Sequence, residues 1–561
     1  MGEAFLSLFF VILFLYYVRI MFFVYMRFIQ IRRKPLVENR DYGIMEKTKG
    51  NEGIIMTMLP YIRGVGKDAA LIVDGAPMAL RAGEVHNSSA SSLEYMDQTV
   101  WPAVRNRHMN CLIVPVYWEC IEPEEGKFDF SLVDGLLEQA RRENMRLELL
   151  WFGLWKNSSS TYVPQWVKED RQRFWYVRTR EGKIPTFYGG ITFILSPFCR
   201  EAVEADKRAF AKLMAHLREH DPEHTVILMQ VENEMGVLGT PRDFSPAAQA
   251  AFLEPVPEAL ASHFGKTGCW QEAFGDYAEE AFMAWHYAKA VEEIAASGKA
   301  ELALPMGVNA WLEQEPWYPG SYPSGGPQFK NIDIWRLAAP SIDLYSPDIY
   351  VPYFQDVCRE YAGKGNPLFI PETRAEAAFC LYAVGEHNAM CFAPFGIEDA
   401  AGMQQEMDEK TMELLRLTPE VQRSARNARQ LFDAYAIWEN IEPVLRKSKT
   451  RGFLYAGEPK EQVFLSKVHL DVFYEHAEEG HPTGGGMVAE LSDYDFLVAA
   501  INCTFDFQAD GALLDILTKE DGRYENGVWV RDRILNGDER YHHVVGDQVV
   551  LYRFRLLPVE E

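Results

Sequence analysis

Two short segments of the chain carry acidic side chains suited to acid–base and nucleophilic chemistry. QVENEMG contains Asn233 and Glu234, and FIPET contains Glu372; each segment closes an apolar run. Glycoside hydrolysis requires two carboxyl groups, because one protonates the departing oxygen while the other attacks the sugar or activates water. Either carboxylate alone would fit a salt bridge at a strand end. The two together, with an Asn before one of them, favour a catalytic pair.

The separation of the two carboxyl groups decides the stereochemistry of such a reaction. Retention of configuration requires roughly 5 Å, whereas inversion requires about 6.5–9.5 Å so that a water fits between them. The residues alone do not fix this distance, so both outcomes stay open at this point.

Short β-rich runs alternate with helical stretches from about residue 71 onward, which is typical of a (β/α)8 barrel. Such a barrel carries its active site at the C-terminal ends of its strands. Glu234 and Glu372 follow the fourth and seventh expected strands. The eight expected strands are Leu80–Val85, Cys111–Tyr117, Leu147–Phe152, Thr225–Val231, Leu302–Val308, Ile342–Tyr345, Pro367–Ile370 and Ala389–Ala393.

The pattern of the chain divides it into four segments. Residues 1–55 form a hydrophobic N-terminal segment and linker, and residues 56–418 form the barrel. Residues 419–447 are expected to be connecting helices. Residues 448–561 lose the helical period and predict an antiparallel β-sandwich, with Gly484–Gly486 as a flexible turn.

The N-terminal residues 5–26 are long and apolar enough to cross a bilayer, although Arg19 interrupts them. Four basic residues follow within residues 27–34, so the positive-inside rule would leave the enzyme on the cytoplasmic side of the membrane. A second interpretation is that the start was assigned too far upstream and that translation begins at Met56. Both interpretations stay open.

Composition limits the partners. The net charge of −25 disfavours nucleic acid and anionic lipid and favours a neutral substrate. The eight cysteines show no Cys-x-x-Cys spacing and indicate reduced thiols in a cytoplasmic protein. The thirteen histidines show no metal-ligand spacing, so we expect neither metal nor cofactor. Homo-oligomerisation is left open.

At its two acidic motifs the chain resembles the clan of (β/α)8 retaining glycosidases. The resemblance is closest to glycoside hydrolase family 35, the β-galactosidases, and to the bacterial subgroup with a short C-terminal β domain. It runs from about Leu71 to Asp399, and QVENEMG is its most specific part. It implies that Glu234 is the acid/base, Glu372 the nucleophile and Asn233 a sugar-binding amide.

Further segments support the resemblance, and two depart from it. VYWECIEPEEGKFDFS, residues 116–131, and FAPFGIED, residues 392–399, resemble the family's segments at strands two and eight. Pro115 stands where the family has a sugar-contacting Tyr, and WFGLWKNSSS replaces a Cys-Ala-Glu run after strand three. These departures fall among the residues that recognise sugar hydroxyls and leave the catalytic pair intact.

Several polar and aromatic residues at strand ends are candidate sugar contacts. Asn233 is expected to hydrogen-bond the 2-hydroxyl. Trp311 and Tyr350 directly follow strand ends, and their rings can stack on sugar C–H faces. The remaining candidates are Glu84, Tyr117, Trp155 and Asn157.

The resemblance implies a two-step displacement that cleaves terminal β-galactosyl residues with retention. Glu234 must then be protonated in the first step, and we expect the negative charge of Glu372 to raise its pKa. Two alternatives stay open: another retaining glycosidase of the clan, such as a β-glucanase or an arabinopyranosidase, and a carbohydrate-binding scaffold without activity.

Overall fold

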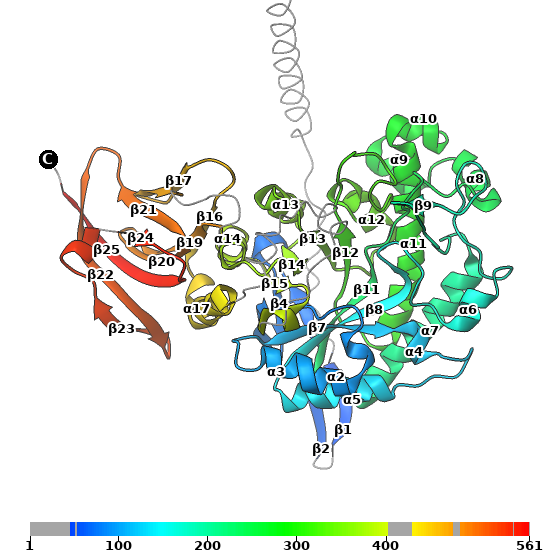
Figure 1. The fold of residues 1–561 in the computed structure, drawn as a ribbon, viewed down its shortest axis with the longest axis horizontal. Helices are drawn as coiled ribbons and strands as arrows, with labels where there is room; N and C mark the ends of the chain where they lie inside the picture. The colour runs from blue at the N-terminus through cyan, green and yellow to red at the C-terminus, as the bar shows by residue number, and fades with distance from the viewer. Residues whose placement is uncertain (1–44, 51–52, 402–428, 475–482, 542, 560–561) are drawn as a thin grey trace, which may run out of the picture. The chain divides into compact units, whose positions relative to one another are not determined.

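The computed structural model describes residues 45–50, 53–401, 429–474, 483–541 and 543–559 (Figure 1). Residues 5–26 lie outside these ranges. In the part of the chain that is described, no helix is both long and apolar enough to span a membrane. The transmembrane helix, one of the two interpretations left open for residues 5–26, has no counterpart among the helices of the described chain, and we correct that interpretation accordingly.

Eight parallel strands form the barrel, as the sequence predicted. Hydrogen bonding follows the strand order β6, β15, β14, β13, β12, β11, β8, β7. Just after β6, Glu84 forms parallel bridges to Ile113 in β7 and to Phe395 after β15, so this segment pairs with both of its neighbours. The strands are β6 (Leu80–Arg81), β7 (Cys111–Tyr117), β8 (Arg146–Lys156), β11 (Val226–Asn233), β12 (Met306–Trp311), β13 (Leu344–Ile349), β14 (Phe369–Thr373) and β15 (Cys391–Pro394).

The sequence pattern explains why these elements form. β7 reads CLIVPVY and is buried at every position, as expected for a parallel strand covered on both faces. The helix α5 (Ser131–Arg142) buries one stripe of side chains, which are Val133, Leu136, Leu137, Gln139 and Ala140. The longer helices α7 (Arg200–His220) and α11 (Ala278–Glu301) precede β11 and β12.

Two strands differ from the sequence prediction in a way that matters for the site. The helix α11 continues to Glu301, so β12 begins only at Met306 and reaches Trp311. β13 likewise runs past Tyr345 to Ile349. Both strands therefore carry buried polar residues near their C-terminal ends, where the sequence prediction had placed loops.

Two antiparallel sheets make up the C-terminal part, in agreement with the predicted β-sandwich, and α17 (Arg429–Leu445) precedes them. The six-stranded sheet runs in the order β16 (Lys449–Leu454), β19 (Gly485–Ser492), β20 (Asp495–Ile501), β25 (Val550–Val559), β22 (Leu513–Glu525), β23 (Val528–Ile534). The four-stranded sheet runs β17 (Lys460–Phe464), β18 (His469–Phe473), β21 (Cys503–Gln508), β24 (Val544–Val545). Their inner faces share one apolar core, which includes Phe453, Leu470, Val488, Phe505 and Phe554.

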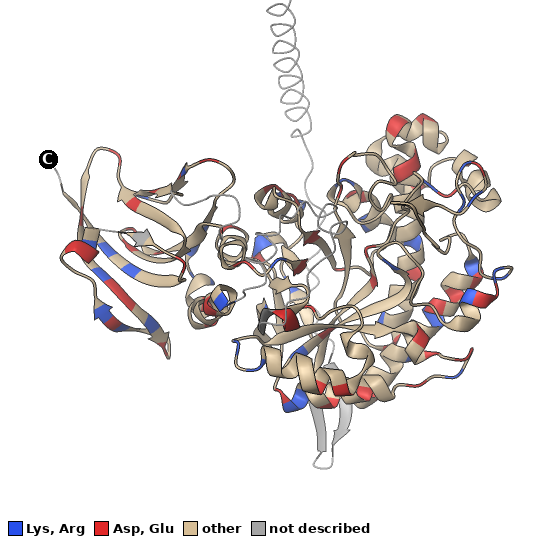
Figure 2. Cartoon of the chain, viewed as in Figure 1, with Lys and Arg blue, Asp and Glu red and all other residues tan. Residues whose placement is uncertain are grey.

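Charged side chains of both signs alternate along β22 and β23 (Figure 2). Cross-strand ion pairs connect them, for example Arg533 to Asp521 at 2.6 Å. β23 is the outer strand of its sheet, and charge on such a strand discourages pairing with another chain.

Gly485 and Gly486 lie within β19, so the predicted flexible turn at this position is wrong. A Cβ on Gly486 would lie 2.3 Å from the Ala499 carbonyl oxygen and 2.6 Å from the Phe453 ring. The glycine thus admits an aromatic ring against the sheet. Close packing also joins β19 to helix α14 (Ala377–His387), because a Cβ on Gly385 would lie 2.3 Å from that of Met487.

We predict that Gly486→Ala lowers the thermal unfolding midpoint by roughly 1–3 °C, since overpacking of this kind costs about 1–3 kcal/mol and the unfolding entropy of a unit this large is about 1 kcal/mol per kelvin. Differential scanning calorimetry would measure the shift. Gly546→Ala is the matched control, because nothing lies within 4 Å of its added Cβ. Equal midpoints for the two variants would contradict the packing argument.

Candidate active site

Three carboxyl groups converge at the C-terminal end of the barrel. Glu234 follows β11, Asp348 lies in β13 and Glu372 lies in β14. One oxygen from each lies within 4.8 Å of the others, and all three residues are buried. The structure thus brings together the two glutamates named from the sequence and adds an aspartate.

A bulge in β8 shapes the end of β11. Val231 pairs with Trp151, whereas Asn233 pairs with Lys156, so β8 contains extra residues that β11 does not match. Gly153 lies in this bulge, where a Cβ would meet the Asp206 carboxylate at 2.3 Å. The bulge places Lys156 and Asn157 beside the QVENEMG motif at the end of β11.

Glu232 and Asp206 hold this bulge in place. Glu232 accepts the backbone N–H of Trp155 at 2.7 Å, and Asp206 accepts that of Leu154 at 2.8 Å. Burial raises the pKa of Glu232 well above its usual range and that of Asp206 to about 6, and the two carboxyl groups share a hydrogen bond. Glu232 is therefore a structural member of its motif.

The backbone around the acid/base candidate is strained. Glu232 and Glu234 both have positive φ angles, of 63° and 46°, which cost of order 1–3 kcal/mol each for residues other than glycine. The Glu234 N–H donates to Asn309 Oδ1 at 2.9 Å, and its carbonyl accepts the Ser158 N–H at 3.1 Å. These contacts hold the Glu234 side chain toward the other carboxyl groups.

Neutral donors hold one oxygen of each carboxyl group. Asn157 donates to Glu234 Oε2, and Asn309 Nδ2 donates to Asp348 Oδ2 at 2.7 Å. Asn157 thus lies where the sequence predicted a site residue, although it contacts the acid/base candidate.

Tyr350 performs the same function for the third carboxyl group. Its hydroxyl donates to Glu372 Oε1 at 2.7 Å. Burial, followed by the charge of Glu372, raises the pKa of Tyr350 well above its usual range, so the hydroxyl stays protonated and remains a donor. This contact fixes the orientation of the nucleophile candidate.

The pKa of Glu234 is raised to about 7. Burial is the main cause, the charge of Glu372 is the second, and Lys156 opposes both. The sequence analysis named only the charge of Glu372, so the direction was right but the principal cause was wrong. A carboxyl group with this pKa can donate and accept a proton near neutrality.

Two further carboxyl groups beside this pair have raised pKa values. Burial, then the charge of Glu372, raises the pKa of both Asp348 and Glu84 well above the usual range. Asp348 shares a hydrogen bond with Glu234, which raises the pKa of Asp348 further. The cluster thus avoids gathering several negative charges in a buried space.

Several polar atoms around the cluster are buried without a hydrogen-bond partner among the described residues. Both polar atoms of the Asn233 amide are in this state, as are Glu84 Oε1, Asp348 Oδ1 and Glu372 Oε2. Buried polar groups are normally paired, so atoms left over at one place can pair with water or with a bound polar ligand. A sugar ring offers hydroxyls that can pair with such atoms.

Other predicted contacts lie elsewhere. Trp155 is fully buried, donates to the Leu195 carbonyl at 2.9 Å and packs against Tyr287, so we withdraw it as a sugar contact. Tyr117 is 2% exposed, and its ring stacks on Tyr162. Its side chain thus belongs to the packed interior.

Trp311 is the predicted contact that lies nearest the opening of the barrel. It is half-buried at the end of β12, and its indole N–H donates to Gln314 Oε1 at 3.3 Å. Its strand partner is Asp348. A role in stacking on a sugar therefore stays a prediction that its position supports.

Sequence reasoning missed Asp348, Asn309 and Lys156. The first two were missed because the fifth and sixth strands were ended too early, and a polar residue near the end of each strand was the available signal. Lys156 had no comparable signal, because its position depends on the bulge in β8.

Two groups among the described residues are spaced to hold a cation. One is the carboxyl cluster itself, and the other joins Asp134 to His216 and His220, one helical turn apart on α7. Because His216 and His220 lie one turn apart on the same helix, the prediction that the histidines lack metal-ligand spacing is wrong. The helix α7 ends just before the N-terminal end of β11, so this second group lies away from the carboxyl cluster. The expected absence of a metal stays a prediction.

Comparison with known families adds to this geometry. Residues 102–289 match the family Glyco_hydro_42, described as beta-galactosidase, and this segment contains Glu234 but ends before Glu372. Residues 431–545 match a domain of unknown function, DUF5597. The chain is a glycosidase similar to β-galactosidases. The match is to family 42, so the finer prediction of family 35 is not confirmed.

Solved structures similar to this chain include two β-galactosidases. That from Rahnella sp. R3 has 17% identity and a TM-score of 0.43, covering 66% of this chain and 57% of its own. The β-galactosidase from Bacillus circulans has 12% identity and a TM-score of 0.48, and the match covers 85% of this chain and 99% of that enzyme. The β-amylase catalytic domain of Paenibacillus polymyxa has 12% identity and a TM-score of 0.42, and the match covers 60% of this chain and 98% of that domain. No curated protein matches the chain.

We predict that kcat/KM for an aryl β-glycoside with a poor leaving group falls as pH rises through about 7, because Glu234 then loses its proton. With a dinitrophenyl leaving group, which departs without protonation, this decline should disappear. Parallel pH profiles of the two substrates would measure it. The same decline with both would assign it to another group.

We predict that Tyr350→Phe lowers kcat about 10- to 100-fold, since a hydrogen bond to a charged group is worth roughly 1.5–3 kcal/mol. Steady-state kinetics on an aryl β-glycoside would measure the loss. Tyr494→Phe, in the turn between β19 and β20, is the control and should match the wild-type protein. Full activity of Tyr350→Phe would contradict the positioning role.

Proposed function

We propose that this protein hydrolyses terminal β-galactosyl residues of oligo- or polysaccharides with retention of configuration. In the first step Glu372 attacks the anomeric carbon while Glu234 gives its proton to the departing oxygen. The bond to the leaving group breaks and a galactosyl ester of Glu372 forms. In the second step Glu234 takes a proton from water, which attacks the ester and releases galactose.

The observation that carries this proposal is the closeness of the two carboxyl groups. Their nearest oxygens lie within 4.8 Å, which is compatible with the separation of roughly 5 Å expected for retention. Inverting enzymes have the longer separation of about 6.5–9.5 Å, which leaves room for a water between the carboxyl groups, so the short distance here favours retention.

The change in charge during the reaction supports the two roles of Glu234. The ionised Glu372 contributes to the raised pKa of Glu234, so the free enzyme keeps a proton to donate. Once Glu372 is esterified its charge is gone, and the pKa of Glu234 falls. The acid of the first step thereby becomes the base of the second.

The unpaired polar atoms support a sugar in this place. Asn233 can both donate and accept, and we assign it to the 2-hydroxyl. The raised pKa of Glu84 favours its protonated form, which can donate to one sugar hydroxyl and accept from another. The choice of galactose rather than glucose as the sugar rests on the match of residues 102–289 to a family described as beta-galactosidase.

Cellular location and assembly complete the proposal. All eight cysteines are free, and six of them are buried. Free thiols of this kind support the cytoplasm as the location. Homo-oligomerisation stays open.

Azide rescue tests the assignment of both glutamates. We predict that Glu372→Gly loses roughly 10⁴-fold or more in kcat on a chromogenic β-galactoside, and that azide restores turnover with α-galactosyl azide as product. Glu234→Gly with azide and an activated substrate should give β-galactosyl azide, because the ester on Glu372 still forms. Nuclear magnetic resonance distinguishes the two products.

The matched control is Glu254→Gly, an exposed glutamate after α8 (Pro246–Leu253), which should behave as the wild-type protein. For the wild type, the first product should be β-galactose. An initial α-galactose product would contradict retention, and preference for a β-glucoside or arabinopyranoside over the galactoside would contradict the sugar.

A further inference from the structure

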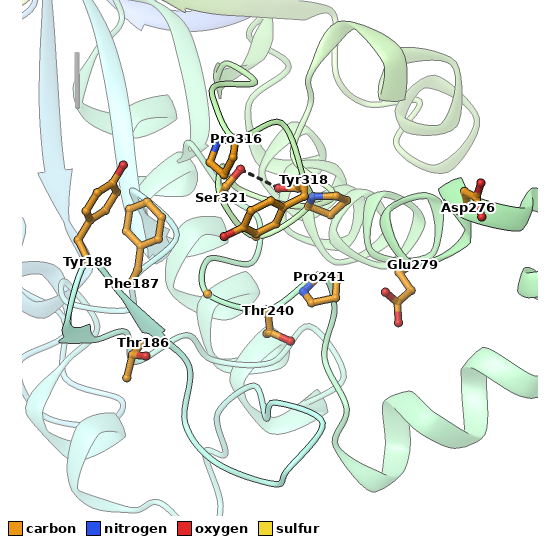
Figure 3. A pocket seen from close by; sticks show the side chains of 13 residues that line it. Thr186, Phe187, Tyr188, Thr240, Pro241, Asp276, Glu279, Pro316, Tyr318 and Ser321 are labelled. Atoms are coloured by element: carbon orange, nitrogen blue, oxygen red, sulfur yellow. Dashed lines mark hydrogen bonds between the residues drawn. The ribbon is translucent and has the colours of Figure 1, made fainter. Parts of the chain in front are cut away.

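A pocket of about 630 Å³ opens among three loops of the barrel (Figure 3). Its walls come from residues 186–188, 239–241 and 316–321, together with Asp276 and Glu279. The three loops follow β8, β11 and β12, which are neighbours in the sheet. This loop pocket therefore lies on the same end of the barrel as the carboxyl cluster.

Aromatic contact connects the loop pocket to the carboxyl cluster. Phe187 in the pocket wall meets the Trp311 ring edge-on, with 6.1 Å between the ring centres. Trp311 is the strand partner of Asp348, and Asp348 is the strand partner of Glu372. Adjacent strands are about 4.8 Å apart, so the pocket begins within roughly 10–15 Å of the nucleophile candidate.

The loop pocket lies on the side of the acid/base candidate. Its loop 239–241 begins five residues after Glu234, whereas no segment of its wall follows β14, which carries Glu372. The acid protonates the oxygen that leaves with the second sugar, so the leaving group must extend toward Glu234. A substrate chain on that side runs toward the loop pocket.

Interlocked loops form the floor of the pocket. The Gly239 N–H donates to the Gly320 carbonyl at 2.8 Å. A Cβ on Gly239 would lie 2.4 Å from the Thr186 carbonyl oxygen, and one on Gly320 would lie 2.7 Å from that of Thr240. Both glycines have positive φ angles, of 79° and 98°. Such close backbone packing gives the pocket a defined shape.

The chemistry of the wall fits uncharged sugar units. In Figure 3 the rings of Phe187 and Tyr188 lie on one side and the Glu279 carboxylate on the other, with Tyr318 between them. Tyr188 and Tyr318 are 57% and 58% exposed, so their ring faces are available for stacking on sugar C–H groups.

Carboxyl groups in the wall offer acceptors for sugar hydroxyls. Arg180 and Arg242 form ion pairs with Glu279 at 3.2 Å and 3.4 Å, and the oxygens of this carboxyl group can accept from sugar hydroxyls. Asp276 adds a second carboxyl group, and the lining residues include no lysine or arginine.

We propose that the loop pocket binds the neutral sugar units on the leaving-group side of the scissile bond, so that the enzyme prefers oligosaccharides to short galactosides. This inference rests on the proposed function. It names a part of the substrate that the carboxyl cluster does not contact.

The test measures binding and turnover separately. Binding of neutral β-1,3- and β-1,4-galacto-oligosaccharides of two to five units to the Glu372→Gln variant is measured by isothermal titration calorimetry. Turnover of the same sugars by the active enzyme is compared with that of a chromogenic β-galactoside. In at least one series, affinity and kcat/KM should rise from two to three or four units.

Removing one ring from the wall should reduce this gain. We expect Tyr318→Ala to lower the ratio of oligosaccharide to aryl-galactoside kcat/KM roughly 3- to 10-fold, as for loss of an aromatic contact. Tyr318→Phe keeps the ring and should restore the ratio. Tyr541→Ala removes a tyrosine of similar exposure, 60%, from the C-terminal part of the chain and should change nothing.

The outcomes separate the two proposals. Affinity and kcat/KM that do not depend on chain length in either series, or a gain that Tyr318→Ala fully retains, would overturn the loop pocket as a subsite while leaving galactoside hydrolysis intact. No turnover of the aryl galactoside, with chain-length-dependent binding that Tyr318→Ala weakens, would overturn the proposed function and support the pocket.

Discussion

The candidate site depends on placing several carboxyl groups in one buried space without letting their negative charges accumulate. Like charges a few ångströms apart repel strongly where water is excluded. Here the raised pKa values of Glu84 and Asp348 favour their neutral forms, and Lys156 supplies a nearby positive charge. The bulge in β8 puts this lysine in place, so the Glu232 and Asp206 contacts that hold the bulge also sustain the electrostatics of the site.

The surroundings of the two glutamates differ, and this difference separates their roles. Glu372 accepts a hydrogen bond at 2.7 Å from a tyrosine hydroxyl that stays protonated, and this contact holds its carboxyl group in one orientation. Glu234 accepts a hydrogen bond from the Asn157 amide, shares one with Asp348 and has a pKa raised to about 7. One carboxylate is therefore suited to attack and the other to proton transfer, although the residue type is the same.

Much of the fold could be predicted from the sequence because barrel strands are short, apolar and separated by helices. β7 agrees with its predicted range, since every side chain in it is buried. Glu234 and Glu372 could be identified because each directly follows such a run. Asp348 and Asn309 could not, since polar residues inside the barrel interrupt the apolar pattern and made β12 and β13 look shorter. Trp155 illustrates the opposite error, because a sequence does not reveal that a bulge turns an aromatic ring into the core.

The contact between α14 and β19 has a consequence for how this protein could be shortened. α14 follows the strand that carries Glu372, and Gly385 on it meets Met487 with no space between them. Side chains of β16, β19 and β20 belong to the same apolar cluster as the barrel interior, among them Leu454, Met487 and Leu497. Deleting the C-terminal strands would leave this helix surface bare to water. The strands of the DUF5597 segment thus bury part of the apolar surface of the barrel, so the barrel depends on them for this packing.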